Sequence, residues 1–532
     1  MSDRNWWRGA TIYQIYPRSF LDTNGDGVGD LAGATRRLDH VAALGADAVW
    51  LSPFYVSPMC DFGYDVADHK AVDPLFGTLE DADRFIARAH ALGLRVLVDF
   101  VVGHVSDRHP WFRASRADRL NPKADWFTWA DPQPDGGPPN NWLSVFSGPA
   151  WSWEPRRRQY YLHHFLAQQP SLDTRHPDVQ AALLDVAGFW LDRGVDGLRL
   201  DAIDFLGHDP ALRSNPAAGV DPGDAPAKLF GMQRHENDML HPEGEGFLHL
   251  LRTFTEARGG ALLLGEVSSQ PGAFGRIAAY TGPAGPLQTA YTLAPMRGPF
   301  DAQAANSFIL EAARTDSSPC WAFSNHDTMR VASRWCMTDG KVDRRKLALV
   351  AAFQAALRGQ LCVYQGEELG LTEAELTHDQ LRDPFGIAFW PEFKGRDGSR
   401  TPMPWSAEER GFGFSDAAPW LPFGQGHGGC AADRQERDPE SPLAHWRALL
   451  HWRRDTPEIK HGSLAPMSLD APLVGFERVL GDRRTLCLFN LSDERRTLSL
   501  EAGPAVILPG WGFQLLDRSI ARPRRARAVA VA

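Results

Sequence analysis

Acidic and imidazole side chains recur in this sequence where short apolar segments end. Four of these endings carry them, at residues 99–104, 197–201, 264–266 and 323–327. An isolated acidic residue after a strand usually caps the following helix. Capping does not readily explain four such strand ends at one edge of a sheet, because gathered charges repel and lose hydration unless a substrate or a reaction uses them. We therefore expect a site with acid–base chemistry at this edge.

Three carboxylates, Asp201, Glu266 and Asp327, stand at these ends with no lysine among them. Cleavage of a glycosidic bond requires two carboxyl groups whose pKa values are pushed apart by their surroundings. One is ionised beside the anomeric carbon, and the other is protonated beside the leaving oxygen. Arg199 lies two residues before Asp201 and faces the same side of the strand, where it would hold Asp201 ionised and oriented. The pattern therefore indicates cleavage of a glycosidic bond.

Histidine and aromatic residues fit the same chemistry. His104 and His326, at two of the strand ends, are candidate hydrogen-bond donors to sugar hydroxyl groups, and neutral imidazoles can do this without an electrostatic cost. The chain has 18 Trp, 29 Phe and 9 Tyr among 532 residues, together with 49 Gly and 39 Pro. Aromatic rings in long loops are typical of carbohydrate sites, because sugar rings stack on them, although core packing accounts for most of these residues.

Eight apolar segments, separated by stretches of helical periodicity, must position these side chains. The predicted strands are 11–16, 46–51, 94–100, 195–201, 262–266, 288–293, 320–325 and 361–364. Helical periodicity is found at 79–92, 179–193, 246–257 and 344–357. Continuous rather than alternating hydrophobicity is typical of strands that are buried on both faces of a parallel sheet. Eight β/α units predict an α/β fold that closes into a (β/α)8 barrel, with its active site at the carboxyl ends of the strands.

Two polar insertions interrupt the barrel pattern, and a different pattern follows it. Residues 105–175 are too long for a loop after the third strand and predict an inserted domain B with no clear helix. A second insertion follows the eighth strand at about 366–430. The catalytic barrel is therefore expected at 1–104 and 176–457. Short alternating segments predict an antiparallel β-sandwich at 458–532. These segments are 473–477, 485–491, 496–500, 505–507 and 512–516.

An oxygen-rich loop near the start of the chain predicts a cation site. Side-chain oxygens recur at every second position of residues 22–30, with glycines between them. This spacing can wrap one hard cation, as in an EF-hand loop, but the loop lacks the distal glutamate and its flanking helices are not indicated. The predicted ligands are Asp22, Asn24, Asp26, the carbonyl group of Val28, and Asp30. A polar, glycine-rich turn is the alternative interpretation.

Composition argues against several classes of protein. Lys and Arg number 56 and Asp and Glu number 66, a net charge of −10, which argues against a nucleic-acid partner. The apolar run 347–357 falls short of the roughly 18–20 residues of a membrane-spanning helix, so no membrane association is expected. The start of the chain has no basic stretch followed by an apolar core, and the six cysteines are scattered. We therefore expect a cytoplasmic protein with reduced thiols.

The strand-end segments and their neighbours resemble the signature regions of the α-amylase superfamily, glycoside hydrolase family 13. The resemblance extends from Trp7 into the C-terminal domain and includes IYQIYPRSF at 12–20. Within the family, the chain is most similar to the α-glucosidase and oligo-1,6-glucosidase branch. The segments that indicate this branch are DFGYD at 61–65, QPSLD at 169–173 and RTPMPW at 400–405.

The resemblance implies a role for each strand-end carboxylate. Asp201 would be the nucleophile, Glu266 the general acid/base, and Asp327 the stabiliser of the transition state that holds the sugar's 2- and 3-hydroxyl groups. The implied pocket for the terminal, non-reducing glucose consists of Asp61, Tyr64, His104, Phe146, Gln169, Arg199, His326 and Arg400. Asp61 and Arg400 as a pair would bind the 4-hydroxyl end and close the pocket, which implies exo action.

The activity implied by the resemblance is that of a retaining exo-α-glucosidase with transglucosylation, acting on small α-glucosides and oligosaccharides. One structural divalent cation, Ca²⁺ or Mg²⁺, is expected in the oxygen-rich loop, with no organic cofactor, in a monomer or homodimer. A dedicated α-glucosyltransferase and a sucrose hydrolase or isomerase remain alternatives, because acceptor choice depends on residues beyond the carboxylates. In the glucosidase branch, the residue directly after the nucleophile is Thr where α-1,4 linkages are preferred and Val where α-1,6 linkages are preferred. This chain has Ala202 there, so the resemblance leaves the linkage open. A non-catalytic binding protein on this fold is disfavoured, because the three carboxylates and Arg199 are all present.

Overall fold

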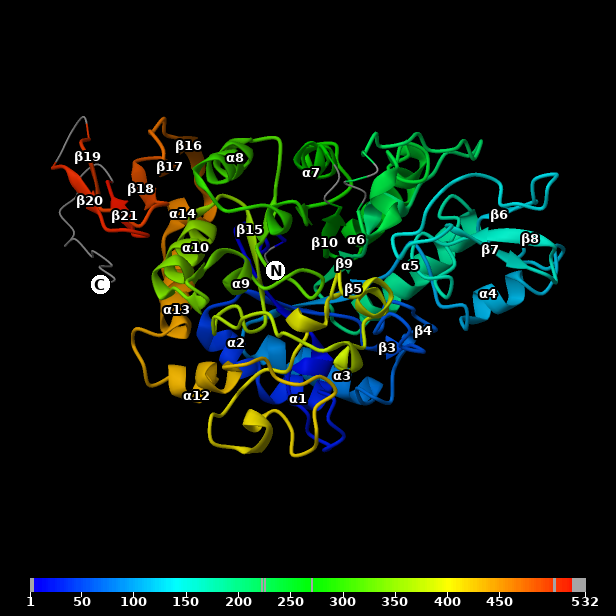
Figure 1. The fold of residues 1–532 in the computed structure, drawn as a ribbon, viewed down its shortest axis with the longest axis horizontal. Coiled ribbons are helices and arrows are strands. Elements are labelled where there is room, and N and C mark those ends of the chain that lie inside the picture. Colours follow the sequence, from blue (N-terminus) through cyan, green and yellow to red (C-terminus); the bar gives the residue numbers. More distant parts are fainter. Residues whose placement is uncertain (1–3, 222, 224–225, 269–270, 501–503, 519–532) are drawn as a thin grey trace.

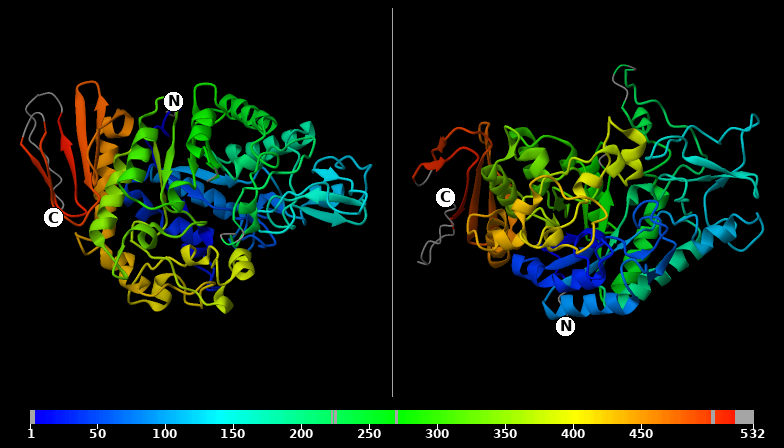
Figure 2. Two further views of the ribbon diagram at one scale, coloured as in Figure 1. Left: turned by 45° about the horizontal axis from the view of Figure 1, so that its top comes forward. Right: turned by 60° about the horizontal axis from the view of Figure 1, so that its bottom comes forward.

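A computed structural model of the chain describes residues 4–221, 223, 226–268, 271–500 and 504–518. Its centre is a ring of eight parallel strands, and two smaller β-sheet regions lie at opposite ends of the molecule (Figure 1, Figure 2). Residues 501–503 and 519–532 of the expected C-terminal domain lie outside the described residues. The boundaries between the expected domains remain predictions.

The central sheet is a (β/α)8 barrel. Its strands are β1 (Thr11–Ile15), β2 (Ala48–Leu51), β5 (Arg95–Phe100), β9 (Gly197–Leu200), β10 (Leu262–Val267), β11 (Thr289–Thr292), β12 (Cys320–Ala322) and β15 (Gln360–Tyr364). They pair in the order β11-β10-β9-β5-β2-β1-β15-β12, and a parallel bridge between Ala290 and Pro319 closes the ring. All eight predicted strands are present, so the predicted barrel is confirmed.

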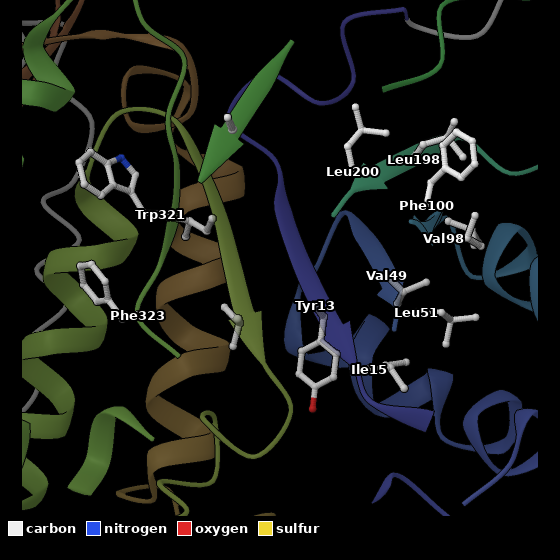
Figure 3. Packing of buried hydrophobic residues seen from close by; sticks show 14 of the residues in the cluster. Tyr13, Ile15, Val49, Leu51, Val98, Phe100, Leu198, Leu200, Trp321 and Phe323 are labelled. Carbon is white, nitrogen blue, oxygen red and sulfur yellow. The ribbon is translucent and has the colours of Figure 1, made fainter. Parts of the chain in front are cut away.

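Alternate residues of each barrel strand face the surrounding helices or the barrel interior. The helix-facing set, part of which Figure 3 shows, includes Tyr13, Val98 and Leu198. Leu97 and Leu264 belong to a separate cluster inside the barrel. The side chains on both faces of the strands are therefore buried, which is why the strands appear as continuous apolar segments in the sequence.

Helices cover the barrel between successive strands. They are α1 (Leu31–Arg36), α2 (Leu38–Leu44), α3 (Leu79–Ala91), α5 (Pro177–Asp192), α6 (Glu245–Ala257), α7 (Ala273–Thr281), α8 (Ala302–Ala313), α9 (Val331–Trp335), α10 (Arg344–Ala356) and α13 (Pro442–Asp455). Helix α3 begins at a capping box, in which the side chains of Thr78 and Asp81 each accept a hydrogen bond from the other residue's backbone amide. The four predicted helices correspond to α3, α5, α6 and α10.

The inserted segment after β5 forms a small sheet of its own at the right of Figure 1. Its elements are α4 (Pro110–Ser115), β6 (Trp129–Ala130), β7 (Trp151–Glu154) and β8 (Gln159–Leu162). Trp142 and Trp151 anchor a separate core beneath this sheet. Helix α4 departs from the prediction of no clear helix. Pro110 at its first position and the cap by His109 explain why six residues can form a helix there.

Two further loops leave the barrel near its carboxyl-terminal mouth. The hairpin β3 (Tyr55–Val56) and β4 (Asp68–Val72) follows β2 and holds residues 61–65 between its strands. A second short hairpin, β13 (Met337–Thr338) and β14 (Lys341–Val342), precedes α10. The segment after β15 has little regular structure beyond α11 (Pro384–Phe389) and α12 (Ala432–Gln435).

The C-terminal region packs two antiparallel sheets against each other and against the barrel. The larger sheet contains β16 (Ser463–Pro466), β17 (Leu473–Leu480), β18 (Arg483–Asn490) and β21 (Phe513–Asp517), after α14 (Pro457–His461). The smaller contains β19 (Arg496–Leu498) and β20 (Val506–Leu508). Phe489 packs edge-on against Phe353 of α10, with ring centroids 5.2 Å apart. Leu486 and Leu488 alternate with it and pack toward Leu508 in the other sheet. The predicted C-terminal β domain is therefore confirmed.

Two expectations from composition can be compared with the structure. No helix in the described ranges is long and apolar enough to cross a bilayer. All six cysteines are described, and none of them forms a disulfide. Burial raises the pKa of the Cys60 thiol to about 11, with the neighbouring Asp65 adding to the shift, so this thiol stays protonated at neutral pH.

Candidate active site

The structure brings the three strand-end carboxylates together around one cavity. Asp201 directly follows β9, Glu266 lies on β10, and Asp327 follows β12. On β9 and β10 the alternation that points Leu264 into the barrel also points Arg199 and Glu266 inward at the mouth. All three carboxylates line a cavity of about 140 Å³.

Arg199 joins two of these carboxylates. Its guanidinium is fully buried, and Nη1 donates to Asp201 at 2.7 Å and to Asp99 at 2.8 Å. Nη2 donates to the hydroxyl of Tyr291 at 2.6 Å and contacts the carboxylate of Glu266. One cation therefore supports both Asp201 and Glu266 from beneath the cavity. The predicted contact between Arg199 and Asp201 is present.

Burial acts against the ionised form of the carboxylates around Arg199. Desolvation raises the pKa of Asp201, and the positive charge of Arg199 opposes this shift. Desolvation raises the pKa of Asp99 to about 7, also against Arg199. Asp99 accepts hydrogen bonds from Tyr64 at 2.9 Å and from the Trp50 indole at 3.2 Å. The buried guanidinium of Arg199 therefore offsets part of the desolvation cost and favours the ionised form of Asp201.

Asp327 differs from the other two carboxylates in its surroundings. It accepts from Arg396 Nη1 at 3.1 Å and from Arg400 Nη2 at 2.8 Å, and His326 Nε2 lies 3.1 Å away. Burial opposes the ionised form, but His326 and the two arginines outweigh it and hold the pKa of Asp327 well below its ordinary range. Asp327 is therefore a fixed negative charge at the cavity.

The two predicted histidines are neutral. Burial lowers the pKa of His326 to about 3 and that of His104 to about 4. The His326 ring lies between Tyr16 and Tyr64, at centroid distances of 5.5 and 5.3 Å. The Gln14 side-chain amide donates to His326 Nδ1 at 2.8 Å, which leaves the ring proton on Nε2, on the side of Asp327.

Asp61 forms one end of the cavity, with a partner that differs from the predicted one. It accepts from Gln169 Nε2 at 3.0 Å and from Arg396 Nη2 at 2.7 Å. The predicted partner, Arg400, instead donates to the carbonyl group of His326 at 2.7 Å and to Asp327, and it does not line the cavity. The Asp61–Arg400 pair is therefore replaced by Asp61–Arg396. The reason is that the His326 carbonyl fixes Arg400 behind the Asp327 carboxylate, and Arg396 is left to reach Asp61.

Arg396 is also the main residue that sequence reasoning missed. It chelates Asp383 through Nε and Nη2, at 3.0 and 2.8 Å, in addition to contacting Asp61 and Asp327. Its guanidinium carbon lies 5.4 Å from the ring centre of Phe146. Arg396 and Arg400 flank one short 3₁₀ turn, Asp397–Ser399, and no periodicity in the sequence there indicates which arginine reaches the cavity.

Aromatic rings from the two insertions meet above the cavity. Phe146, from the segment after β5, stacks on Phe385 of α11 with centroids 3.9 Å apart and an interplanar angle of 8°. The predicted residues fall into two groups with respect to the cavity wall. Those that line it are Asp61, Tyr64, His104, Phe146, Gln169, Asp201, Glu266 and Asp327. Those that lie behind it are Arg199, His326 and Arg400.

A second cavity, of about 470 Å³, adjoins the first on the side of Glu266. Both cavities are lined by Val145, Phe165, Ala202, Lys228, Glu266, Leu293, Arg297 and Phe393. Ala202 has a left-handed backbone, with φ 44° and ψ 48°, which turns the chain sharply after Asp201. Left-handed geometry is unfavourable for a residue with a Cβ, so the surrounding structure must hold this turn in place. The second cavity was not predicted.

The oxygen-rich loop is held by its own backbone amides. The Asp22 carboxylate accepts from the amides of Asn24 and Gly27, and Asp30 caps α1 by accepting from the Gly33 amide. The donor set suits a hard cation in chemical type. Within the described part of the chain, however, no three His, Cys, Asp or Glu side chains converge as they would around a metal ion. In this arrangement Asp22, Asp26 and Asp30 point to backbone donors rather than to a common centre.

Comparison with known proteins agrees with this architecture. The family model described as the α-amylase catalytic domain matches residues 14–462. A probable α-glucosidase of Rhizobium meliloti (strain 1021) is 50% identical over 531 residues, covering 98% of this chain and 96% of that protein. An oligo-1,6-glucosidase of Heyndrickxia coagulans is 34% identical over 530 residues, covering 92% of each. The crystal structure of an α-glucosyl transfer enzyme, XgtA, superposes with a TM-score of 0.91 at 47% identity, covering 96% of this chain and 98% of that one. By fold, site geometry and sequence, the chain belongs to the α-amylase family.

Proposed function

We propose that the protein is a retaining, exo-acting α-glucosidase that releases terminal α-glucose from short oligosaccharides or glucosides and also transfers glucose to other acceptors. The observation that carries the proposal is the contact of both Asp201 and Glu266 with the single guanidinium group of Arg199. Two carboxylates on one guanidinium lie close together. This favours the separation of about 5–5.5 Å found in retaining enzymes over the roughly 6.5–9.5 Å of inverting ones.

In the first chemical step, a carboxylate oxygen of Asp201 bonds to the anomeric carbon as the bond to the leaving oxygen breaks. The carboxyl group of Glu266 gives its proton to that leaving oxygen. In the second step, Glu266 takes a proton from water, the water oxygen bonds to the anomeric carbon, and the ester bond to Asp201 breaks. Both side chains return to their starting states, so the cycle consumes one water per glucose released.

Asp327 supports both steps through its charge. Positive charge develops on the sugar ring in each transition state, and an ionised carboxylate nearby stabilises it. The low pKa of Asp327, held by His326 and the two arginines, keeps this charge in place without a proton exchange. Neutral His326 places its ring beside the Asp327 carboxylate without adding positive charge.

The exo character is proposed from the end of the cavity at Asp61. The Asp61–Arg396 pair and the Phe146–Phe385 stack stand where a longer glucan would have to continue past the non-reducing end. Both groups can bind the terminal ring, the ion pair through its hydroxyls and the phenyl rings through its apolar edge. A single terminal glucose then fits, and an internal residue of a polymer does not.

The covalent step is tested with Glu266→Gln and an aryl α-glucoside. An aryl leaving group departs without protonation, but the variant cannot activate water, so a glucosyl-enzyme should accumulate. Mass spectrometry of the quenched protein is expected to show one added hexose, and peptide mapping should locate it on Asp201. The double variant Asp201→Ala/Glu266→Gln is the matched control and should show none. Absence of the adduct in the single variant, with the aryl group released, would exclude double displacement.

Transfer is supported by the second cavity, because an acceptor could be held there beside Glu266 in place of water. A dedicated α-glucosyltransferase and a sucrose hydrolase or isomerase share this requirement. Incubation with maltose, isomaltose, sucrose and trehalose, followed by NMR of the products, separates these activities. Free glucose as the main product supports hydrolysis, whereas rearranged or lengthened sugars support transfer or isomerisation.

We also propose that the loop at 22–30 binds one structural divalent cation, Ca²⁺ or Mg²⁺, through Asp22, Asn24, Asp26, the Val28 carbonyl and Asp30. The donor types and their spacing support this proposal, and binding would require the carboxylates to exchange amide hydrogen bonds for the ion. Chelation is then expected to lower the melting temperature more than it lowers turnover below melting. Loss of turnover at unchanged stability would contradict a structural role.

The unpaired thiols support a cytoplasmic location.

A further inference from the structure

Two cationic side chains stand where the two cavities meet. Lys228 and Arg297 line both of them. Lys228 is half-buried, with its ammonium group 4.6 Å from the ring centre of Phe385 and 4.1 Å from that of Phe393. Arg297 is exposed to the cavity mouth. Among the residues that the structure describes, no carboxylate forms an ion pair with either cation.

The carboxylates of the second cavity have other partners or face solvent. Asp204 accepts from the backbone amide of Ser268 at 2.8 Å and lies 3.7 Å from Arg276. Glu266 is in contact with Arg199, and Glu392 is exposed at the rim. The carboxylates whose charge acts on the two cations, Asp383 on Lys228 and Asp327 on Arg297, are themselves ion-paired with Arg396. A half-buried cation without a carboxylate partner is costly unless a ligand supplies the negative charge.

The remaining wall of the second cavity is aromatic. Phe165, Phe205, Phe230 and Phe393 line it, together with Pro226 and small apolar residues. Flat apolar rings of this kind bind the face of a sugar or of an aromatic ring. The cavity thus combines an apolar surface for a ring with two cations at the side nearest Glu266.

We propose that this cavity binds acceptors and leaving groups that carry an anionic group on a ring, and that Lys228 and Arg297 recognise the anion. The inference rests on the proposed α-glucosyl transfer and names its acceptor class. In the transfer step, the acceptor hydroxyl loses its proton to Glu266 and its oxygen bonds to the anomeric carbon, while the ester bond to Asp201 breaks. No other reactant is needed.

The test compares acceptors that differ only in charge. The enzyme is supplied with an aryl α-glucoside donor and with para-hydroxybenzoate or its neutral analogue para-hydroxybenzyl alcohol. A second pair is glucose 6-phosphate and glucose, which separates phosphate from carboxylate as the source of the anion. We expect transfer to at least one anionic acceptor to exceed transfer to its neutral partner by about fivefold, the factor equivalent to an exposed ion pair of about 1 kcal/mol.

Variants identify the residues responsible. The ratio of anionic to neutral transfer should fall toward one in Lys228→Gln and in Arg297→Gln, and Lys228→Arg should keep it. The matched control is Lys341→Gln, an exposed lysine on β14 that should leave all rates unchanged. Raised salt should lower the ratio in the parent enzyme.

Two outcomes would overturn the inference without touching the proposed function. They are equal transfer to charged and neutral acceptors, and an anionic preference that survives in both Gln variants. If no glucose is released or transferred from any donor, the proposed function itself fails. A preference confined to the phosphate pair or to the carboxylate pair supports the inference and shows which of the two anionic groups the cavity binds.

Discussion

Arg199 lets two carboxylates stand side by side at the mouth of the barrel. Asp201 and Glu266 contact the same guanidinium group, and Asp99 holds that group from behind. The shared cation favours the ionised form of Asp201, the proposed nucleophile, and holds the Glu266 carboxyl group beside it. Arg396 has the same function at the opposite side, where it contacts Asp61, Asp327 and Asp383. The site is therefore built from carboxylates arranged around two buried arginines.

The Arg396→Lys variant tests this arrangement at the residue scale. A lysine keeps the positive charge but cannot reach three carboxylates in the planar geometry of a guanidinium. We expect kcat/KM for an exo substrate to fall by about tenfold or more, because the Asp61 end of the cavity loses its fixed partner. The matched control is Arg434→Lys, an exposed arginine paired with Glu408. Unchanged kinetics in Arg396→Lys would show that Asp61 does not need this partner.

The contrast between Arg396 and Arg400 shows how far residue-level prediction reaches. Arg199 and Glu266 could be placed from the sequence, because strand alternation fixes the side to which each side chain points. Arg396 and Phe385 could not, because they lie in the segment after β15, where no period relates sequence position to direction. Their contacts depend on how that segment folds over the barrel. Asp99 was visible at a strand end but was not assigned a place beside Arg199.

At the scale of elements, buried arginines also connect the C-terminal region to the barrel. Arg478 on β17 donates to the carbonyl group of Ala356, at the end of α10, at 2.7 Å, and to that of Gly462 at 2.9 Å. Arg453 on α13 donates to the carbonyl groups of Ala355 and Leu357, at 2.7 and 3.0 Å. The last carbonyls of a helix have no partners within it, and a cation there is also favoured by the helix dipole. These two side chains therefore complete the end of α10.

Replacing Arg478 by Met tests this connection. Met fills similar space but leaves buried carbonyls without donors, at a cost of about 2–4 kcal/mol, which for a chain of this size is about 2–4 °C in melting temperature. Turnover below melting should be unchanged. The end of α10 leads into the start of β15, whereas the active site lies at the carboxyl ends of the barrel strands. The exposed Arg483→Met on β18 is the control and should leave the melting temperature unchanged. An unaltered melting temperature in Arg478→Met would show that the contact adds nothing to stability.

Element prediction succeeded where burial leaves a signal in composition. Most barrel strands are continuous apolar segments because both of their faces are covered. Strand β11 has the sequence TAYT and is less apolar, but all four of its residues are buried. Helix α4 and strand β16 were missed because they are short and because α4 depends on Pro110 and a side-chain cap rather than on periodicity. The small sheet after β5 could be predicted as an insertion but not as three strands.

At the scale of the whole molecule, buried carboxyl groups near β15 link stability to pH. Burial raises the pKa of Glu367 to about 8, from an ordinary value of 4.5. Its neighbour on the same segment, Glu373, is raised by burial to about 7. Because these values lie above those of the unfolded chain, the folded state binds more protons in this range. The stability they contribute is complete below the ordinary value of 4.5, falls as the pH rises above it, and is lost by the folded-state values of about 7 and 8.

Glu367→Gln tests this linkage, since the amide is uncharged at every pH. The melting temperature of the variant relative to the parent is expected to rise from about pH 4.5 to about pH 8 and then to level off, because in that range the parent's unfolded chain loses the proton that its folded state still holds. Exposed Glu408→Gln should show a difference that does not depend on pH. A constant difference for Glu367→Gln would mean that this carboxyl group is not protonated in the folded protein at neutral pH.

The central claim is that Asp201 and Glu266 act in two successive displacements at one anomeric carbon. The anomeric form of the first glucose released from an α-glucoside, followed by NMR before mutarotation equilibrates it, tests this claim most directly. Two displacements predict α-glucose as the first product. β-Glucose as the first product would mean a single displacement by water, and the assignment of Asp201 as a nucleophile would be wrong.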